Sequence, residues 1–415
     1  MRRMLLLSVI CLAAIPSRVP GEENWPALHG PRHNSSSDAT GLPLQWSESK
    51  NIVWKTPIHD SGWSSPVIWG DQVWLTTATD DGKQSFALCV HRQSGKVIHD
   101  LKVFETAEPQ DTRQYNTFAS PTPVIEAGRV YVSFGSYGTA CLDTRSGEVL
   151  WKRSDLPCLH WRGPASSPIL FGDLLLLHFD DYDFQYVAAL DKRTGATVWK
   201  KDRDIDYGTT NGDLKKAYAT PLVIEVNGRK QLISQAAKAT FAFDPQTGEE
   251  LWRFVHGGHS TAARALFGQG LVYLLSGTEK KLFAVKPEGR GDITATHVAW
   301  DYSKSMPRHP SPLLIGEMLY VIDDGGVLTC LEAATGKMAF AERIGGDFWS
   351  SLLHADGRIY CLSNQGKTTV VAAEPKFRIL AENELDGAFR ASPAVSDKSL
   401  FLRSETHLYR IGESK

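Results

Sequence analysis

Several features that mark common protein classes are scarce or missing in this sequence. Only six cysteines occur in 415 residues, and the five beyond residue 21 are an odd number, which argues against a complete disulfide framework. Beyond the N-terminus, no run of roughly 20 apolar residues could cross a membrane as a helix. Basic residues are not in excess either, with 45 Lys and Arg against 47 Asp and Glu. A nucleic-acid partner, which would require a basic surface, is therefore not expected.

Motifs of the common catalytic classes are also missing. The chain contains no nucleophile elbow, phosphate-binding P-loop, dinucleotide fingerprint or H-E-x-x-H zinc motif. It shows no convincing amphipathic helix pattern. With 42% hydrophobic and 22% charged residues, the composition is still that of an ordinary globular protein with a large core.

The first 21 residues have the pattern of a secretory signal peptide. Two arginines precede an apolar run at residues 4–15, and small residues suit cleavage before Glu22. A buried N-terminal helix and a lipoprotein anchor at Cys11 are the alternatives. We expect a secreted or periplasmic protein with an extended leader at residues 22–50 and a single domain over residues 51–415. Removal of residues 1–21 leaves 42 basic and 47 acidic residues.

A short motif of a small residue, Ser or Thr, and usually Pro recurs along the chain. Clear copies are "SSP" at 64–66 and "ATP" at 219–221, and weaker copies are "STA" at 260–262 and "SSL" at 350–352. Neighbouring copies are 40 to 55 residues apart, a period typical of propeller blades. The third residues of the eight copies stand at positions 66, 121, 168, 221, 262, 312, 352 and 393.

A second motif places Ser or Thr before a glycine, as in "CLDTRSGEVLW". Glycine accepts a positive φ without steric cost, and Asp or Ser side chains can bond the turn's backbone, so each copy predicts a tight hairpin. In three copies a tryptophan follows four residues later and is expected to pack near the outer strand. The fifth and seventh repeats lack this turn, which indicates different hairpins there. The structural turn residues are Gly95, Gly147, Trp151, Gly195, Trp199, Gly248, Trp252 and Gly336.

Between the two motifs lie pairs of short β-type runs, such as "PVIEAGRVYVSFG". Each repeat therefore predicts four antiparallel strands, and eight repeats predict an all-β, eight-bladed β-propeller. A solenoid is the alternative, but it would need polar caps at both ends. The last repeat stops before its fourth strand, whereas "NIVWKT" near residue 51 resembles a fourth strand alone. We therefore predict that this N-terminal strand completes the last blade and closes the ring.

The turn sequences "CLDTRSGEVLW", "ALDKRTGATVW" and "AFDPQTGEELW" resemble the repeat of the pyrroloquinoline-quinone-type (PQQ-like) propellers. That family includes quinoprotein dehydrogenases and BamB-like outer-membrane assembly proteins. The resemblance covers nearly all of the chain after residue 21 and is specific for the fold, not for an activity. The chain lacks the adjacent cysteine pair and the haem-binding C-x-x-C-H motif of family enzymes, and their calcium ligands and catalytic Asp have no match. No catalytic residue is therefore carried over.

The connections that enter each blade are expected to surround the mouth of the central channel. The residue three before each register point is mostly aromatic or basic, and convergent aromatic and polar side chains suit a ligand or peptide site. Side chains that simply fill the channel are the alternative. The candidates, with two nearby residues, are Trp63, Phe118, His160, Arg162, Tyr218, His259, His309, Trp349 and Arg390.

One stretch has a partial calcium-loop pattern. "DRDIDYGTTNGD" places acidic residues at positions 1, 3, 5 and 12, but Tyr207 stands where the loop needs glycine. A solvated connecting loop is the simpler interpretation, and we expect no metal here. The weak candidate ligands are Asp202, Asp204, Asp206 and Asp213.

These patterns favour a monomeric, non-catalytic binding or assembly scaffold that acts through its loop face and channel mouth. Its partner would be an envelope or secreted protein, or a small ligand or glycan. A quinone (PQQ)-dependent oxidoreductase or quinone binder, with calcium, is one alternative. A carbohydrate-binding propeller is the other. No cofactor is expected under the leading hypothesis.

Overall fold

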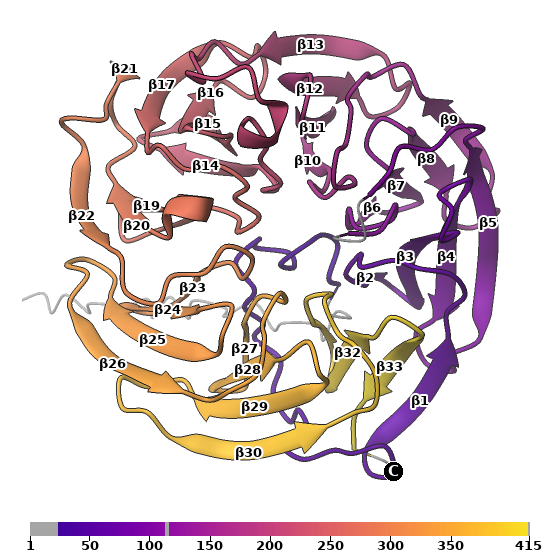
Figure 1. Cartoon of the computed structure of the whole chain (residues 1–415). Coiled ribbons are helices and arrows are strands. Elements are labelled where there is room, and N and C mark those ends of the chain that lie inside the picture. The colour runs from indigo at the N-terminus through magenta and orange to yellow at the C-terminus, as the bar shows by residue number, and fades with distance from the viewer. Residues whose placement is uncertain (1–23, 113–115, 414–415) are drawn as a thin grey trace, which may run out of the picture.

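The structure is a computed structural model, and it describes residues 24–112 and 116–413. The predicted signal peptide, and with it Cys11, lies outside the described residues. Eight blades of four antiparallel strands are arranged in a ring around a central axis (Figure 1), so the predicted eight-bladed β-propeller is confirmed; the sheet of blade 4 has a fifth, parallel strand. The two short helices are of the 3-10 type, η1 (Gly212–Leu214) and η2 (Gly277–Glu279).

Each blade begins with an inner strand near the central axis and ends with an outer strand, which is largely exposed except in blade 4. Blades 1 to 4 contain β2 (Val67–Trp69), β3 (Gln72–Ala78), β4 (Gln84–His91) and β5 (Val97–Glu105); β6 (Val124–Glu126), β7 (Arg129–Ser133), β8 (Thr139–Asp143) and β9 (Val149–Arg153); β10 (Ile169–Phe171), β11 (Leu174–Asp180), β12 (Gln185–Asp191) and β13 (Thr197–Asp202); and β14 (Leu222–Val226), β15 (Arg229–Gln235), β16 (Ala239–Phe243) and β17 (Glu250–Val255).

The second half of the ring repeats the same order. Blades 5 to 8 contain β18 (Leu266–Gly268), β19 (Leu271–Leu275), β20 (Leu282–Val285) and β22 (Val298–Tyr302); β23 (Leu313–Ile315), β24 (Met318–Ile322), β25 (Val327–Glu332) and β26 (Met338–Arg343); β27 (Leu353–Ala355), β28 (Arg358–Leu362), β29 (Lys367–Ala372) and β30 (Ile379–Glu384); and β31 (Ala394–Ser396), β32 (Ser399–Arg403), β33 (His407–Ile411) and β1 (Ile52–Pro57).

The ring closes where the two ends of the domain pair. Strand β1 runs antiparallel to β33, with Lys55 opposite Tyr409 and Thr56 opposite Leu408. The N-terminal strand thus supplies the outer strand of blade 8, as the repeat pattern predicted (Figure 1). This pairing leaves blade 8 with four strands like the others.

The predicted turns form, and their tryptophans join neighbouring blades. Asp143 Oδ1 accepts hydrogen bonds from the turn's own backbone at 2.8 and 2.9 Å. Trp151, on the outer strand of blade 2, packs on the next blade's turn, where a Cβ atom on Gly195 would lie 2.6 Å from the indole. Its Nε1 donates to Lys192 O at 3.0 Å. Each such contact fixes one blade against the next.

Blade 5 has the different hairpin that its sequence indicated. Its connection between β20 and β22 contains β21 (Gly291–Asp292), which pairs in parallel with β17 of blade 4. Blade 5 therefore offers no glycine turn to Trp252, whose Nε1 donates instead to Gln231 Oε1 at 2.8 Å. The tryptophan is fully buried there.

The leader packs inside the ring instead of lying on its surface. Trp25 pairs with Ile68 of blade 1, and the Ser37 N–H donates to His354 O of blade 7 at 2.9 Å. Trp25 and Trp46 are 1% and 3% exposed, so the leader contributes to the core. The indigo segment at the centre of Figure 1 is this part of the chain.

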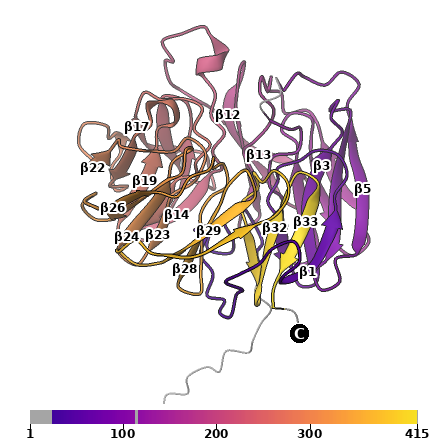
Figure 2. The ribbon, with the colours of Figure 1, turned by 60° about the horizontal axis from the view of Figure 1, so that its bottom comes forward.

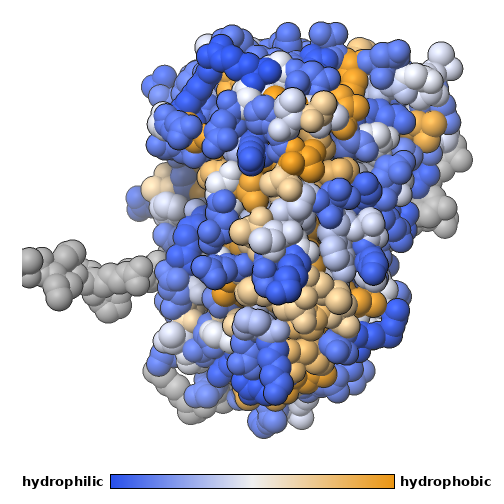
Figure 3. Space-filling model, turned by 90° about the vertical axis from the view of Figure 1, so that its left-hand side faces the viewer, coloured by the Kyte–Doolittle hydropathy of each residue, from blue (hydrophilic) through white to orange (hydrophobic). Residues whose placement is uncertain are grey.

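The two faces and the outer wall of the ring differ in character. The connection that carries η1 projects beyond the blades on one face (Figure 2). On the side that carries β22 and β26, apolar patches lie between polar side chains (Figure 3), and the outer strands there expose Val298 and Met338. Within the part of the chain that the structure describes, no helix is long and apolar enough to span a membrane.

Candidate functional site: the channel mouth

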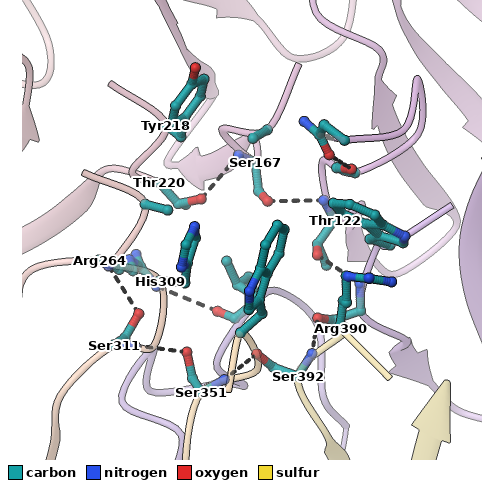
Figure 4. A pocket seen from close by; sticks show the side chains of 18 of the residues that line it. Thr122, Ser167, Tyr218, Thr220, Arg264, His309, Ser311, Ser351, Arg390 and Ser392 are labelled. Atoms are coloured by element: carbon teal, nitrogen blue, oxygen red, sulfur yellow. Dashed lines mark hydrogen bonds between the residues drawn. The ribbon is translucent and has the colours of Figure 1, made fainter. Parts of the chain in front are cut away.

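A ring of hydrogen bonds joins the blades where the chain enters each inner strand. Two residues before that strand, seven blades carry Ser or Thr, whose hydroxyl accepts from the backbone N–H of the preceding blade (Figure 4). The seven bonds measure 2.9 to 3.1 Å, and the bond from Ser392 N to Ser65 Oγ joins blade 8 to blade 1. We call this the hydroxyl ring; its positions are Ser65, Thr122, Ser167, Thr220, Arg264, Ser311, Ser351 and Ser392.

Arg264, in blade 5, breaks the hydroxyl ring. Its own N–H donates to Ser311 Oγ at 2.9 Å, but it has no hydroxyl to offer to the Thr220 N–H. The guanidinium donates from Nε and Nη2 to Pro221 O at 3.0 and 2.6 Å, and from Nη1 to Leu28 O at 3.4 Å. Burial lowers the pKa of Arg264 to about 9. This is the one ring position at which a charged side chain replaces a hydroxyl.

The hydroxyl ring surrounds a cavity of about 440 Å³, within the usual size range of small-molecule sites. The leader contributes Leu28 and His29 to its wall. Burial, and then the charge of Arg264, hold the pKa of His29 well below its usual value and lower that of His33 to about 3. Both imidazoles are therefore neutral at pH 7.

Three aromatic side chains form one wall of the cavity, which we call the aromatic shelf: Trp63, His309 and Trp349. The rings of His309 and Trp349 are stacked, with centroids 4.4 Å apart and planes 8° apart. Trp63 meets Trp349 edge to face at 5.3 Å. The Arg390 guanidinium lies 4.6 Å from the Trp63 ring centroid, a cation–π contact that fixes the shelf.

The charged residues that line the cavity are all basic. No Asp or Glu of the described chain is among its lining residues. The carboxylates lie behind the wall, each paired with a lining arginine: Asp213 with Arg162, Asp324 with Arg308, and Glu405 with Arg390.

Asp324 illustrates how these carboxylates are held. Burial alone would raise its pKa, but hydrogen bonds and charge from His309 and Arg308 lower the pKa of Asp324 to about 2. Its Oδ1 lies 3.1 Å from His309 Nδ1. The aspartate is thus a charged anchor for the shelf, and its oxygens are already engaged.

The structure brings six of the nine candidate mouth residues to the cavity. These are Trp63, Arg162, Tyr218, His309, Trp349 and Arg390. They come from loops of blades 1, 3, 4, 6, 7 and 8, so residues far apart in sequence share one lining.

The predicted register was wrong in the second and fifth repeats. In blade 2 the ring residue is Thr122, which belongs to the second Ser/Thr-Pro pair of the "SPTP" stretch and not to the first. In blade 5 it is Arg264, which has no hydroxyl and is not followed by proline. The residues that enter the mouth there are consequently Ser120 and Ala262. In every blade the ring position lies two residues before the inner strand. Counting back from the predicted inner strands would therefore have located the ring positions of blades 2 and 5.

The remaining three candidates lie away from the lining. Phe118 is 8% exposed and packs edge to face on Tyr137. His160 is buried, and its Nδ1 lies 3.2 Å from Asp181 Oδ2. His259 bonds locally, with Nδ1 3.0 Å from Ser260 Oγ.

The weak metal candidates do not come together. Asp204 has an 88% exposed side chain, whereas Asp213 lies near η1 and pairs with Arg162 and Lys216. Across residues 24–112 and 116–413, no three His, Cys, Asp or Glu side chains form a group that could hold a metal ion. Asp202 ends β13 and Asp206 bonds the Gly208 N–H at 2.8 Å, as in an ordinary loop.

Comparisons with known proteins agree with this architecture. Part of the chain is 33% identical to a quinoprotein ethanol dehydrogenase of Pseudomonas putida over 149 residues, which is 32% of this chain and 23% of that protein. The chain therefore spans about a quarter of the length of that curated relative.

Two solved structures share the fold at low identity. One is BamB from Moraxella catarrhalis, with a TM-score of 0.61 and 12% identity over 87% of this chain and 99% of that one. The other is a europium-containing methanol dehydrogenase, with a TM-score of 0.70 and 9% identity over 93% and 90% of the two chains.

A family model matches most of the chain directly. The model described as outer membrane protein assembly factor BamB matches residues 38–201 and 237–376. These ranges include the glycine turns and tryptophans that join the blades. The chain belongs to this BamB family of PQQ-like β-propellers.

Proposed function

We propose that this protein is a non-catalytic binding scaffold that engages a partner through the face bearing the channel mouth. The observation that carries the proposal is the lining itself: an aromatic shelf beside four arginines, with no carboxylate among the described lining residues. Aromatic residues and arginine are the side chains that most often dominate binding energy at protein interfaces. The lining supplies anchors for a partner, not a set of acid and base groups.

A calcium-held quinone fits this cavity poorly. Calcium takes six to eight oxygen ligands and relies on carboxylates for charge. The lining offers only neutral hydroxyl, amide and carbonyl oxygens, and the nearest carboxylates are engaged by Arg162, Arg308 and Arg390. The set also contains no free Asp that could act as a general base. We therefore propose no redox step, although dehydrogenases share the fold.

A carbohydrate is favoured less than a protein partner. The shelf of Trp63 and Trp349 could stack on a sugar ring, but a neutral glycan leaves the buried charge of Arg264 without a counter-ion. A partner segment with acidic groups would satisfy both features. Membership in the BamB family supports a protein partner as well.

The proposed setting is the cell envelope or the exterior, with the protein as a monomer. Support comes from the signal-like sequence at residues 1–21 and from membership in the family of the outer membrane protein assembly factor BamB.

A pull-down from envelope extract tests the proposal. We expect the wild-type protein to retain a defined partner and the Trp349→Ala variant to lose most of it, because removal of the indole collapses the shelf. Ala substitution of Trp69, a partly buried tryptophan on inner strand β2 that is not among the cavity's lining residues, is the matched control. Dye reduction with quinone, calcium and alcohols should give no turnover. Turnover without a captured partner would overturn the proposal.

A further inference from the structure

We propose that the break in the hydroxyl ring at Arg264 is a carboxylate-binding subsite at the base of the channel mouth. The inference rests on the proposed binding function and names the chemistry that the mouth takes. The ligand would place one carboxylate against the Arg264 guanidinium and the Thr220 N–H. A flat apolar group next to the carboxylate would then contact the aromatic shelf.

Arg264 carries a buried charge without a counter-ion. It is 2% exposed, and no carboxylate of the described residues lies within ion-pair distance of it, whereas the other three lining arginines each have one. The neighbouring imidazoles of His29 and His33 supply no counter-charge, because an imidazole is either neutral, as here, or positive. A buried charge that lacks a partner is costly, so an arginine at this position calls for an anion.

The Arg264 guanidinium also has unused hydrogen-bonding capacity. Its five N–H donors face three contacts, two of which share Pro221 O while the third, to Leu28 O, is long at 3.4 Å. A planar guanidinium with free donors matches a carboxylate, which accepts two parallel bonds. The side chain lines the cavity, so a ligand there can reach it.

A second donor lies beside the guanidinium. At the seven other ring positions the backbone N–H donates to the next hydroxyl, but the Thr220 N–H has no acceptor in residues 24–112 and 116–413. Thr220 lines the same cavity as Arg264, so a ligand atom placed there could accept this bond. Arg264 donates to the carbonyl of Pro221, the residue after Thr220. The spare N–H groups of the guanidinium and the unpaired Thr220 N–H therefore lie in the same corner of the cavity (Figure 4).

Arg403 shows what distinguishes this site. It is also a fully buried arginine with a pKa lowered to about 9 by burial, and it donates to Ser64 O at 2.9 Å. However, it does not line the cavity. Arg403 is therefore the matched control for a buried arginine that a ligand cannot reach.

The test uses tryptophan fluorescence, because Trp63 and Trp349 report on the shelf. The probes are acetate, 3-phenylpropionate and the neutral 3-phenylpropionamide. We expect 3-phenylpropionate to bind at least about tenfold more tightly than its amide, since hydrogen bonds to charged groups contribute at least that factor. Acetate should compete with it.

The informative variant is Arg264→Ser, which restores the residue type of the other blades. Serine offers Thr220 N–H its missing acceptor, so the variant should unfold at the same or a higher temperature, while its affinity for 3-phenylpropionate falls at least about tenfold. Arg403→Ser should leave that affinity unchanged. Equal binding of acid and amide, unchanged affinity in Arg264→Ser, or no binding of either acid would overturn the proposal.

A peptide arm distinguishes the source of the carboxylate. A tripeptide ending in phenylalanine is compared as the free acid and as the C-terminal amide. Tighter binding of the free-acid peptide than of 3-phenylpropionate assigns the site to a chain end, and the reverse assigns it to a small acid. If the protein binds the carboxylate probes but captures no envelope partner, the carboxylate subsite stands and the proposed scaffold function is refuted. If it captures a partner but does not bind the probes, the scaffold function stands and the subsite is refuted.

Discussion

Replacing Trp54 by alanine should open the propeller at its closure. Trp54 lies on β1, the N-terminal strand of blade 8, and its indole packs on the first turn of blade 1, where a Cβ atom on Gly95 would lie 2.7 Å away. Its Nε1 donates to Arg92 O at 2.9 Å, and its edge meets Phe401 at a centroid distance of 5.9 Å. The residue therefore ties together both ends of the ring.

The size of the effect follows from these contacts. Tryptophan-to-alanine changes in a core destabilise by about 3–5 kcal/mol. The lost indole hydrogen bond is part of that sum, at about 1 kcal/mol. Because Trp54 is only partly buried, we expect the free energy of unfolding to fall by about 3 kcal/mol. Urea unfolding followed by far-UV circular dichroism measures it.

Trp151 is the matched control. It makes the same contacts between blades 2 and 3, with Gly195 and Lys192 O, but it does not lie at the closure. Both variants should lose similar stability, whereas hydrogen exchange should accelerate in blades 8 and 1 only for Trp54→Ala. Closure of the ring by β1 would be refuted if Trp54→Ala lowered the free energy of unfolding by less than about 0.5 kcal/mol while Trp151→Ala lowered it by about 3 kcal/mol.

Further predictions concern the turns, a buried ion pair and the leader. Gly195→Ala should lower the free energy of unfolding by about 2 kcal/mol, because φ is +75° and Trp151 occupies the space of the new Cβ. Gly228→Ala should lower it by only about 1 kcal/mol, because φ is similar, at +78°, but the space is open. Equal losses in urea unfolding would contradict the packing of Trp151 on this turn. Asp180→Asn should destabilise the protein by about 3 kcal/mol, because Asp180 pairs with Arg203, whose side chain is 0% exposed and would lose its counter-charge. An unchanged midpoint of urea unfolding would contradict this. The pKa of His33 in the folded protein is about 3, so as the pH falls below about 6.5 this imidazole takes up a proton only in the unfolded chain. The free energy of unfolding should therefore drop by up to about 2 kcal/mol between pH 6.5 and pH 5. Urea unfolding curves that are the same at the two pH values would contradict this.

The fold could be predicted from the sequence because its signals are local and repeated. The Ser/Thr-Gly turn, with the acidic residue before it, specifies a hairpin wherever it occurs, and the missing fourth strand of the last repeat pointed to β1. These features depend on backbone conformation and strand pairing, which neighbouring residues determine.

The site was predicted only in part, because its register depends on contacts between blades. The tandem Ser-Pro and Thr-Pro pairs near residue 121 gave two equally good alignments, and only the hydrogen bond from Ser65 selects Thr122. Arg264 was missed because it breaks the rule by which six of the other seven positions were found, Thr122 being the remaining one. The leader's place inside the ring was also missed, since nothing in residues 24–46 shows which surface will cover Trp25.

The central claim, that the molecule binds a partner through its channel mouth, is tested most directly by site-specific crosslinking. A photo-crosslinking amino acid replaces Ala165, which lines the cavity, or Val298, which is exposed on outer strand β22. In envelope extract, we predict one defined crosslinked species from position 165 that is absent from position 298. The same species from both positions, or from 298 alone, would contradict it.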